Sequence, residues 1–123
     1  MKTGTCRPLP GFVFVIFALS MGRGWSADSV KANNTTSLNV AGNWASGGVP
    51  GTNDRAIWNN TVTGANTFTL GADMILGTIQ ILDPGGLVTI GGNILTLDAT
   101  GTAGTGIDMS GATADLTLFP ATP

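Results

Sequence analysis

Apolar residues two positions apart recur along the second half of the chain, with Gly, Asn or Asp between one pair and the next. The pairs are Phe68/Leu70, Ile79/Ile81, Val88/Ile90, Leu95/Leu97, Ile107/Met109 and Leu116/Leu118. A period of two predicts short β-strands that each bury one face. The intervals between pairs are regular enough for a coil of short strands, although they are not a strict repeat. We therefore expect an all-β protein.

Several all-β architectures share this pattern of short strands. A meander, a sandwich and a barrel all produce it, and a small sandwich predicts antiparallel pairing throughout. The short strands, the Thr-rich polar alternates and the small number of bulky core residues favour a solenoid, because stacked rungs need only modest Ile, Val and Leu inside. The solenoid predicts parallel pairing between rungs.

The first 27 residues have the order of regions found in a secretory signal peptide. Lys2 and Arg7 precede the apolar run Phe12–Leu19, and the stretch ends in Ser26-Ala27. That run is far shorter than the 18 or so apolar residues that a membrane-spanning helix needs. We expect a signal-peptide helix over residues 1–27, cleavage after Ala27, and a chain that is secreted or displayed at the cell surface.

Two further segments follow the signal peptide. Residues 28–41 are a polar segment leading into the solenoid, for which we expect a loop or extended chain. Residues 42–123 form the predicted N-terminal cap and first rungs. Trp44 and Trp58 stand on either side of Val49-Pro50-Gly51-Thr52, which has the residues of a type II turn. Asp83-Pro84-Gly85-Gly86 predicts a tight reversal.

Composition excludes several classes of function. The only cysteine, Cys6, precedes the apolar run, so the mature chain has neither disulfide nor thiolate site. Beyond residue 27 two cations face seven aspartates, a net charge of −5, which does not suit a nucleic-acid binder. The chain contains no Glu, His or Tyr, so most acid-base and metal-binding groups are missing. We expect no cofactor.

Three stretches together resemble the N-terminal part of autotransporter-associated β-strand repeat proteins. They are GNWASGGVPGTNDRAIW from Gly42, IGGNILTL from Ile90, and GIDMS with ADLTL after it, ending at Leu118. The resemblance implies a right-handed parallel β-helix outside a bacterial cell, serving as a structural or adhesive stalk without catalytic residues. Family members are many hundreds of residues long and end in a translocating barrel or sorting signal. We therefore expect this chain to be the N-terminal part of a longer protein.

Three candidate sites can be weighed on the sequence. Residues 103–109 approach the nonapeptide that binds Ca²⁺ in β-rolls, but one copy cannot supply the six to eight oxygens needed, so a glycine-rich turn is favoured. The aspartates could support carboxylate catalysis, as in polysaccharide-degrading β-helices, but they are scattered and mostly beside turns. Trp44 and Trp58 are candidate carbohydrate contacts, and packing as a cap over the first rung is the favoured alternative.

The sequence thus predicts an exported, non-enzymatic structural or adhesive β-solenoid of the bacterial surface. Its expected partners are surface polysaccharide or other cells, with no nucleic acid and no small-molecule substrate. A membrane would be reached only through a C-terminal part beyond Pro123. The alternative is a carbohydrate-binding or polysaccharide-degrading β-helix fragment. A groove in which two or more aspartates converge near Arg55 or Lys31 would favour the degrading enzyme, and scattered aspartates would favour the scaffold.

Overall fold

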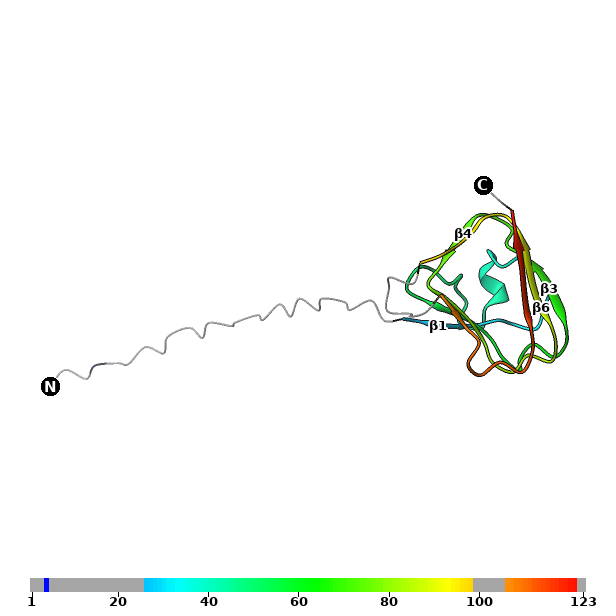
Figure 1. Ribbon diagram of the computed structural model, residues 1–123. Helices are drawn as coiled ribbons and strands as arrows, with labels where there is room; N and C mark the ends of the chain where they lie inside the picture. Colours follow the sequence, from blue (N-terminus) through cyan, green and yellow to red (C-terminus); the bar gives the residue numbers. More distant parts are fainter. Residues whose placement is uncertain (1–3, 5–25, 99–105, 122–123) are drawn as a thin grey trace.

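The computed structural model describes residue 4 and residues 26–98 and 106–121 (Figure 1). The strands are β1 Asp28–Val30, β2 Arg55–Trp58, β3 Asn66–Thr69, β4 Met74–Leu76, β5 Thr78–Ile81, β6 Val88–Gly92, β7 Leu95–Leu97, β8 Ile107–Asp108 and β9 Leu116–Pro120, with one 3₁₀-helix, η1, at Ala41–Asn43. The described part is all-β, as the period of two predicts. The signal peptide predicted at 1–27 lies outside it except for residues 4, 26 and 27.

The strands form three sheets in which every paired strand is parallel to its neighbours. Their orders are β1-β2-β5-β8, β3-β6-β9 and β4-β7. Figure 1 shows the labelled strands on three sides of the molecule, with β1 on one side, β3 and β6 on a second and β4 on a third. The prediction of parallel pairing is confirmed. The small sandwich predicted antiparallel pairing throughout, which these sheets do not have.

The core consists of side chains that point into the space between the three sheets. The register of the paired strands places inward side chains of neighbouring strands next to one another. Phe68 pairs with Ile90, and both side chains are fully buried. In the β4-β7 sheet the buried Leu76 pairs with the partly buried Leu97. Stacking buries each apolar side chain against the corresponding one of the neighbouring strand, so modest aliphatic residues fill the interior.

The polar segment 28–41 contributes a strand and buried residues. Strand β1 pairs with β2 on one edge, and on the other edge Val30 accepts a backbone hydrogen bond from Ala45. Lys31 and Trp44 form an isolated antiparallel bridge beside it. Leu38 is fully buried in the core. The loop through η1 therefore pairs with backbone groups on the outer edge of β1. Residues 28–41, for which we expected a loop or extended chain, include one strand of the sheet.

The type II turn predicted at Val49–Thr52 is wrong. It requires a positive φ at Gly51, whereas the positive-φ glycines of the described chain are Gly47, Gly71, Gly92 and Gly106. The turn lies two residues later, because the Gly51 carbonyl accepts from the Asp54 N–H at 3.1 Å while the Asp54 carboxylate accepts from the Gly51 N–H at 2.8 Å. The aspartate side chain fixes this turn.

The stretch Asp83–Gly86 makes a corner by contact with the preceding turn of chain, and it is a pair of bends without the hydrogen-bonded reversal that we predicted. The Gly85 N–H donates to the Val62 carbonyl at 2.7 Å. A Cβ on Gly85 would collide with the Thr63 carbonyl, and one on Gly86 would crowd Ala65. The two glycines let one corner lie directly on another.

One predicted apolar pair is not buried. Ile107 and Met109 are 40% and 38% exposed, although Ile107 pairs with the buried Ile79. Within residues 26–98 and 106–121, β8 is the last strand of its sheet, so no further strand covers this side of Ile107. No helix in the same ranges is long and apolar enough to span a membrane.

Candidate functional site

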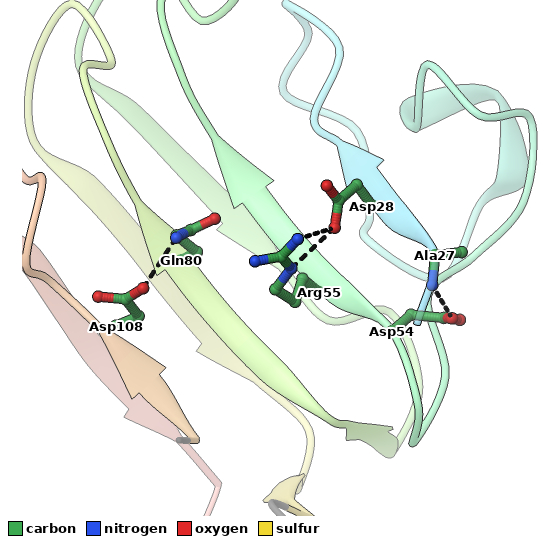
Figure 2. Close-up of polar contacts among 6 residues, drawn as sticks. All are labelled: Ala27, Asp28, Asp54, Arg55, Gln80 and Asp108. Atoms are coloured by element: carbon green, nitrogen blue, oxygen red, sulfur yellow. Dashed lines mark hydrogen bonds and ion pairs between the residues drawn. The ribbon is translucent and has the colours of Figure 1, made fainter. Parts of the chain in front are cut away.

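Two pairs of polar side chains lie on the outward surface of the β1-β2-β5-β8 sheet. Asp28 and Arg55 are register partners on β1 and β2, and the Arg55 Nε and Nη2 atoms both lie 2.7 Å from Asp28 Oδ1 (Figure 2). The Arg55 side chain is 39% exposed and the Asp28 side chain 49% exposed. Exposed ion pairs of this kind contribute about 0–1 kcal/mol, so this pair positions two strands without dominating stability.

Gln80 and Asp108 form a second polar pair further across the same sheet. They are register partners on β5 and β8, and Gln80 Nε2 donates to Asp108 Oδ2 at 2.8 Å (Figure 2). Ser110 donates to the other carboxylate oxygen through its hydroxyl at 2.7 Å and its backbone N–H at 2.9 Å. These Ser110 bonds, followed by Gln80 and the more distant charge of Arg55, lower the pKa of Asp108.

Asp28 and Asp108 therefore lie on the same face as Arg55, but Asp108 is not suited to act as a general acid. A general acid at neutral pH needs a carboxyl group whose pKa is raised, and the shift of Asp108 is in the opposite direction. Asp28 is held by the guanidinium group of Arg55. Within residues 26–98 and 106–121, no three acidic, Cys or His residues gather as metal ligands.

Three further aspartates bind backbone amides at corners. Asp73 Oδ1 accepts from the Ile94 N–H at 3.0 Å, and Asp83 Oδ1 accepts from the Asn60 N–H at 3.1 Å. Asp54 Oδ1 accepts from the Ala27 N–H at 3.1 Å. Each bond joins segments more than 20 residues apart in sequence. These carboxylates tie one turn of chain to the next, which sequence spacing alone did not reveal.

Lys31 is the unexpected polar residue of the core. Its side chain is fully buried, and Nζ donates to the Ala32 carbonyl at 3.0 Å and to Asn34 Oδ1 at 2.6 Å. The ammonium group also lies 4.7 Å from the centroid of the Phe68 ring. Burial lowers its pKa to about 8. Ser29 and Lys31 are both buried while Val30 is not, so the apolar residue of β1 faces the other way and no pattern in the sequence places Lys31 inward.

The two tryptophans lie in the core. Trp44 is 2% exposed and Trp58 is fully buried, with their ring centroids 5.7 Å apart in an edge-to-face arrangement. Trp44 Nε1 donates to the Leu38 carbonyl at 2.8 Å. A sugar ring stacks only on an exposed indole face, so the proposal that Trp44 and Trp58 contact carbohydrate finds no support in their placement. Their burial fits packing beneath the cap.

The residues that were weighed as a calcium site lie only partly within the described chain. Residues 103–105 lie outside it, and Asp108 is already bonded to Gln80 and Ser110. Two carboxylate oxygens with these partners do not form the shell of six to eight oxygens that calcium takes.

A different outward surface was missed at the sequence level. Thr67, Thr89 and Thr117 are register partners across β3, β6 and β9. Beside them the side chain of Phe119 is 55% exposed, and its ring occupies the space where a Cβ of Gly91 would lie. Only the register of three strands brings these residues together, so no local motif identifies them.

Comparisons with known protein families, with curated proteins and with solved structures gave no match.

Proposed function

We propose that this chain is the start of an exported, non-enzymatic β-solenoid of the bacterial cell surface, with a structural or adhesive role. One observation carries the proposal. Along the chain, β2, β3 and β4 go to the three sheets in turn, β5, β6 and β7 go to the same sheets in the same order, and β8 and β9 begin a third round.

That order is the one expected of a chain wound into a coil. Each strand pairs in parallel with the strand of the following round, and every register keeps inward residues beside inward residues. A right-handed parallel β-helix, as in autotransporter-associated β-strand repeat proteins, has this pairing. In such a coil the loop through η1, together with Leu38 and Trp44, would be the N-terminal cap.

A structural or adhesive role follows from what the outward residues do. The aspartates described above bind Arg55, Gln80, Ser110 or backbone amides, so they hold neighbouring strands and corners together. Extended flat faces are the functional surface of solenoids in general. Export would follow from residues 1–27, and the partner would be a polysaccharide or another cell surface.

Disulfide trapping tests the winding. The Thr67→Cys/Thr89→Cys and Ile75→Cys/Thr96→Cys pairs each join register partners that face outward on two different sheets. Neighbouring strands lie about 4.8 Å apart, within the Cα separation that a disulfide spans. We expect both pairs to oxidise to intramolecular disulfides, detected by a mobility shift on non-reducing gels.

The matched control is the Thr67→Cys/Thr117→Cys pair, whose residues stand two strands apart at roughly 9.5 Å. All variants carry Cys6→Ser so that only the introduced thiols react. Equal oxidation of the control and test pairs would contradict the stacked register and with it the solenoid.

Fractionation tests export. Expressed in a Gram-negative host, the chain should leave the cytoplasm and begin at Asp28 by N-terminal sequencing, since Ser26-Ala27 supplies the small residues of a cleavage site. An Ala27→Arg variant should accumulate uncleaved. A wild-type chain that stays uncleaved in the cytoplasm would rule out the surface role.

A further inference from the structure

The outward side chains of strands β3, β6 and β9 carry no charge, and the exposed Asp115 directly precedes β9. Thr67, Thr89 and Thr117 form one outward column, and Thr69, Gly91 and Phe119 form the next. The alternation of exposed and buried residues along β3 places the threonines outside and Phe68 inside. We call the surface of Thr67, Thr89, Thr117 and Phe119 the threonine face.

The hydroxyl groups of this column differ from the outward polar groups of the β1-β2-β5-β8 sheet. On the β1-β2-β5-β8 sheet Arg55 bonds Asp28 and Gln80 bonds Asp108, so those side chains satisfy one another. The side chains of Thr67, Thr89 and Thr117 make no hydrogen bond to the residues the structure describes. One face is therefore satisfied internally, while the other offers a row of donors and acceptors about 4.8 Å apart.

Phe119 adds an aromatic ring to the row. It is the most exposed large apolar side chain of the described chain, at 55%. Its ring carbons Cδ2, Cε2 and Cζ lie over Gly91, which has no side chain to push them away. The sheet thus supports one side of the ring, and the rest remains open to solvent. A fixed exposed aromatic ring beside hydroxyl groups can contact both the apolar and polar parts of a ligand.

We propose that the threonine face binds an uncharged polysaccharide, an inference that rests on the adhesive role proposed above and gives it a ligand class. A sugar chain presents C–H surfaces that stack on an aromatic ring and hydroxyl groups that pair with threonine. Charge selects against anionic polymers, because the face is neutral and the chain beyond residue 27 carries seven aspartates against two cations.

The test measures depletion of the protein, purified after expression of the full 123-residue sequence, from suspensions of cellulose and of chitin, with soluble alginate as an anionic comparison. We expect saturable binding to at least one neutral polymer and none to alginate. Phe119→Ala should weaken it roughly tenfold. Thr67→Val/Thr117→Val, which keeps the shape and removes two hydroxyl groups, should weaken it roughly fivefold.

Ile75→Ala is the matched control, because Ile75 is 53% exposed on β4 of a different sheet and should leave binding unchanged. The inference is overturned if neither polymer binds, if alginate binds as well as the neutral polymers, or if Ile75→Ala weakens binding as much as Phe119→Ala. It is also overturned if Phe119→Ala abolishes only a concentration-dependent dimer seen by light scattering, since the face would then contact a second copy.

These outcomes can be separated from failure of the proposed function. If the cysteine pairs oxidise as expected and the chain is exported, yet neither polymer binds, the polysaccharide inference alone is wrong. If the cysteine pairs fail, the register that forms the threonine face is itself wrong, whatever the polymers show.

Discussion

Burying the ammonium group of Lys31 costs free energy, and neighbouring polar groups and an aromatic ring offset part of that cost. A charge taken out of water must be compensated by hydrogen bonds or an opposite charge. Lys31 has carbonyl and amide oxygens and the Phe68 ring. Residues 32–53 and 56–72, which form the surrounding segments, contain no ionisable side chain, and the nearby Asp28 is paired with Arg55. Burial without a carboxylate partner explains why its pKa falls to about 8.

This shift makes stability depend on pH. In the folded chain Lys31 releases its proton near pH 8, whereas its ordinary pKa is 10.5, so the unfolded chain binds more protons between these values. The free energy of unfolding should therefore rise as pH is raised from about 8 to 10.5, and it should gain nothing from this residue below pH 8. Urea titrations followed by circular dichroism across this range measure the effect.

Lys31→Met is the comparison that isolates this residue. It fills similar space with no titrating group, so the rise above pH 8 should shrink, whatever the variant does to overall stability. A variant that retains the full rise would assign the dependence to another group and contradict the counterion-free burial of Lys31.

At the level of the elements, the period of two located most strands and missed β1, β2 and β4, whose residues do not alternate between apolar and polar. The pairs at 68/70, 79/81, 88/90, 95/97 and 116/118 all fall on or directly beside strands of the structure. Strand β1 buries the polar Ser29 and leaves Val30 half-buried, and β4 is apolar at all three positions Met74–Leu76, so neither shows the alternation. The corners could not be predicted, because their hydrogen bonds come from neighbouring turns of chain, as when Gly85 donates to Val62.

Gly85 provides the test of this corner. A methyl group there would collide with the Thr63 carbonyl and Gly64 nitrogen, both rigid backbone atoms, so Gly85→Ala should destabilise the fold by about 1–3 kcal/mol. Gly48→Ala should be nearly neutral, because nothing lies within 4 Å of its position and its φ is not positive. Urea midpoints of the two variants give the difference. Equal midpoints would mean that the two corners are not stacked.

For the whole molecule, outward residues come together only through register, which is why sequence reasoning found few of them. Register partners on neighbouring strands lie from 21 to 28 positions apart. With such variable lengths, no fixed spacing predicts that Arg55 meets Asp28 or that Phe119 covers Gly91. The position of the aspartates beside turn residues did indicate that they form turns, as Asp54 does.

The open edge of strand β8 leads to a prediction about self-association. Strand β8 has one partner among the described residues, β5, and Ile107 on it is 40% exposed. An open apolar edge invites pairing with another molecule, and a lysine on it opposes that pairing. Ile107→Lys should therefore reduce concentration-dependent light scattering. Val49→Lys, at 39% exposure in a loop, should not, and equal effects would indicate a general influence of charge.

The parallel pairing of each strand with only its nearest neighbours also decides how the molecule would bear a load. Under tension applied to its two termini, the hydrogen bonds between paired strands would break a few at a time, because no strand pairs with one distant in its sheet. In the proposed solenoid, extension should then proceed in steps that each release one round of chain, 21 to 28 residues by the strand registers. Such a stack would unfold stepwise at a force that unfolds a cooperative domain in a single event.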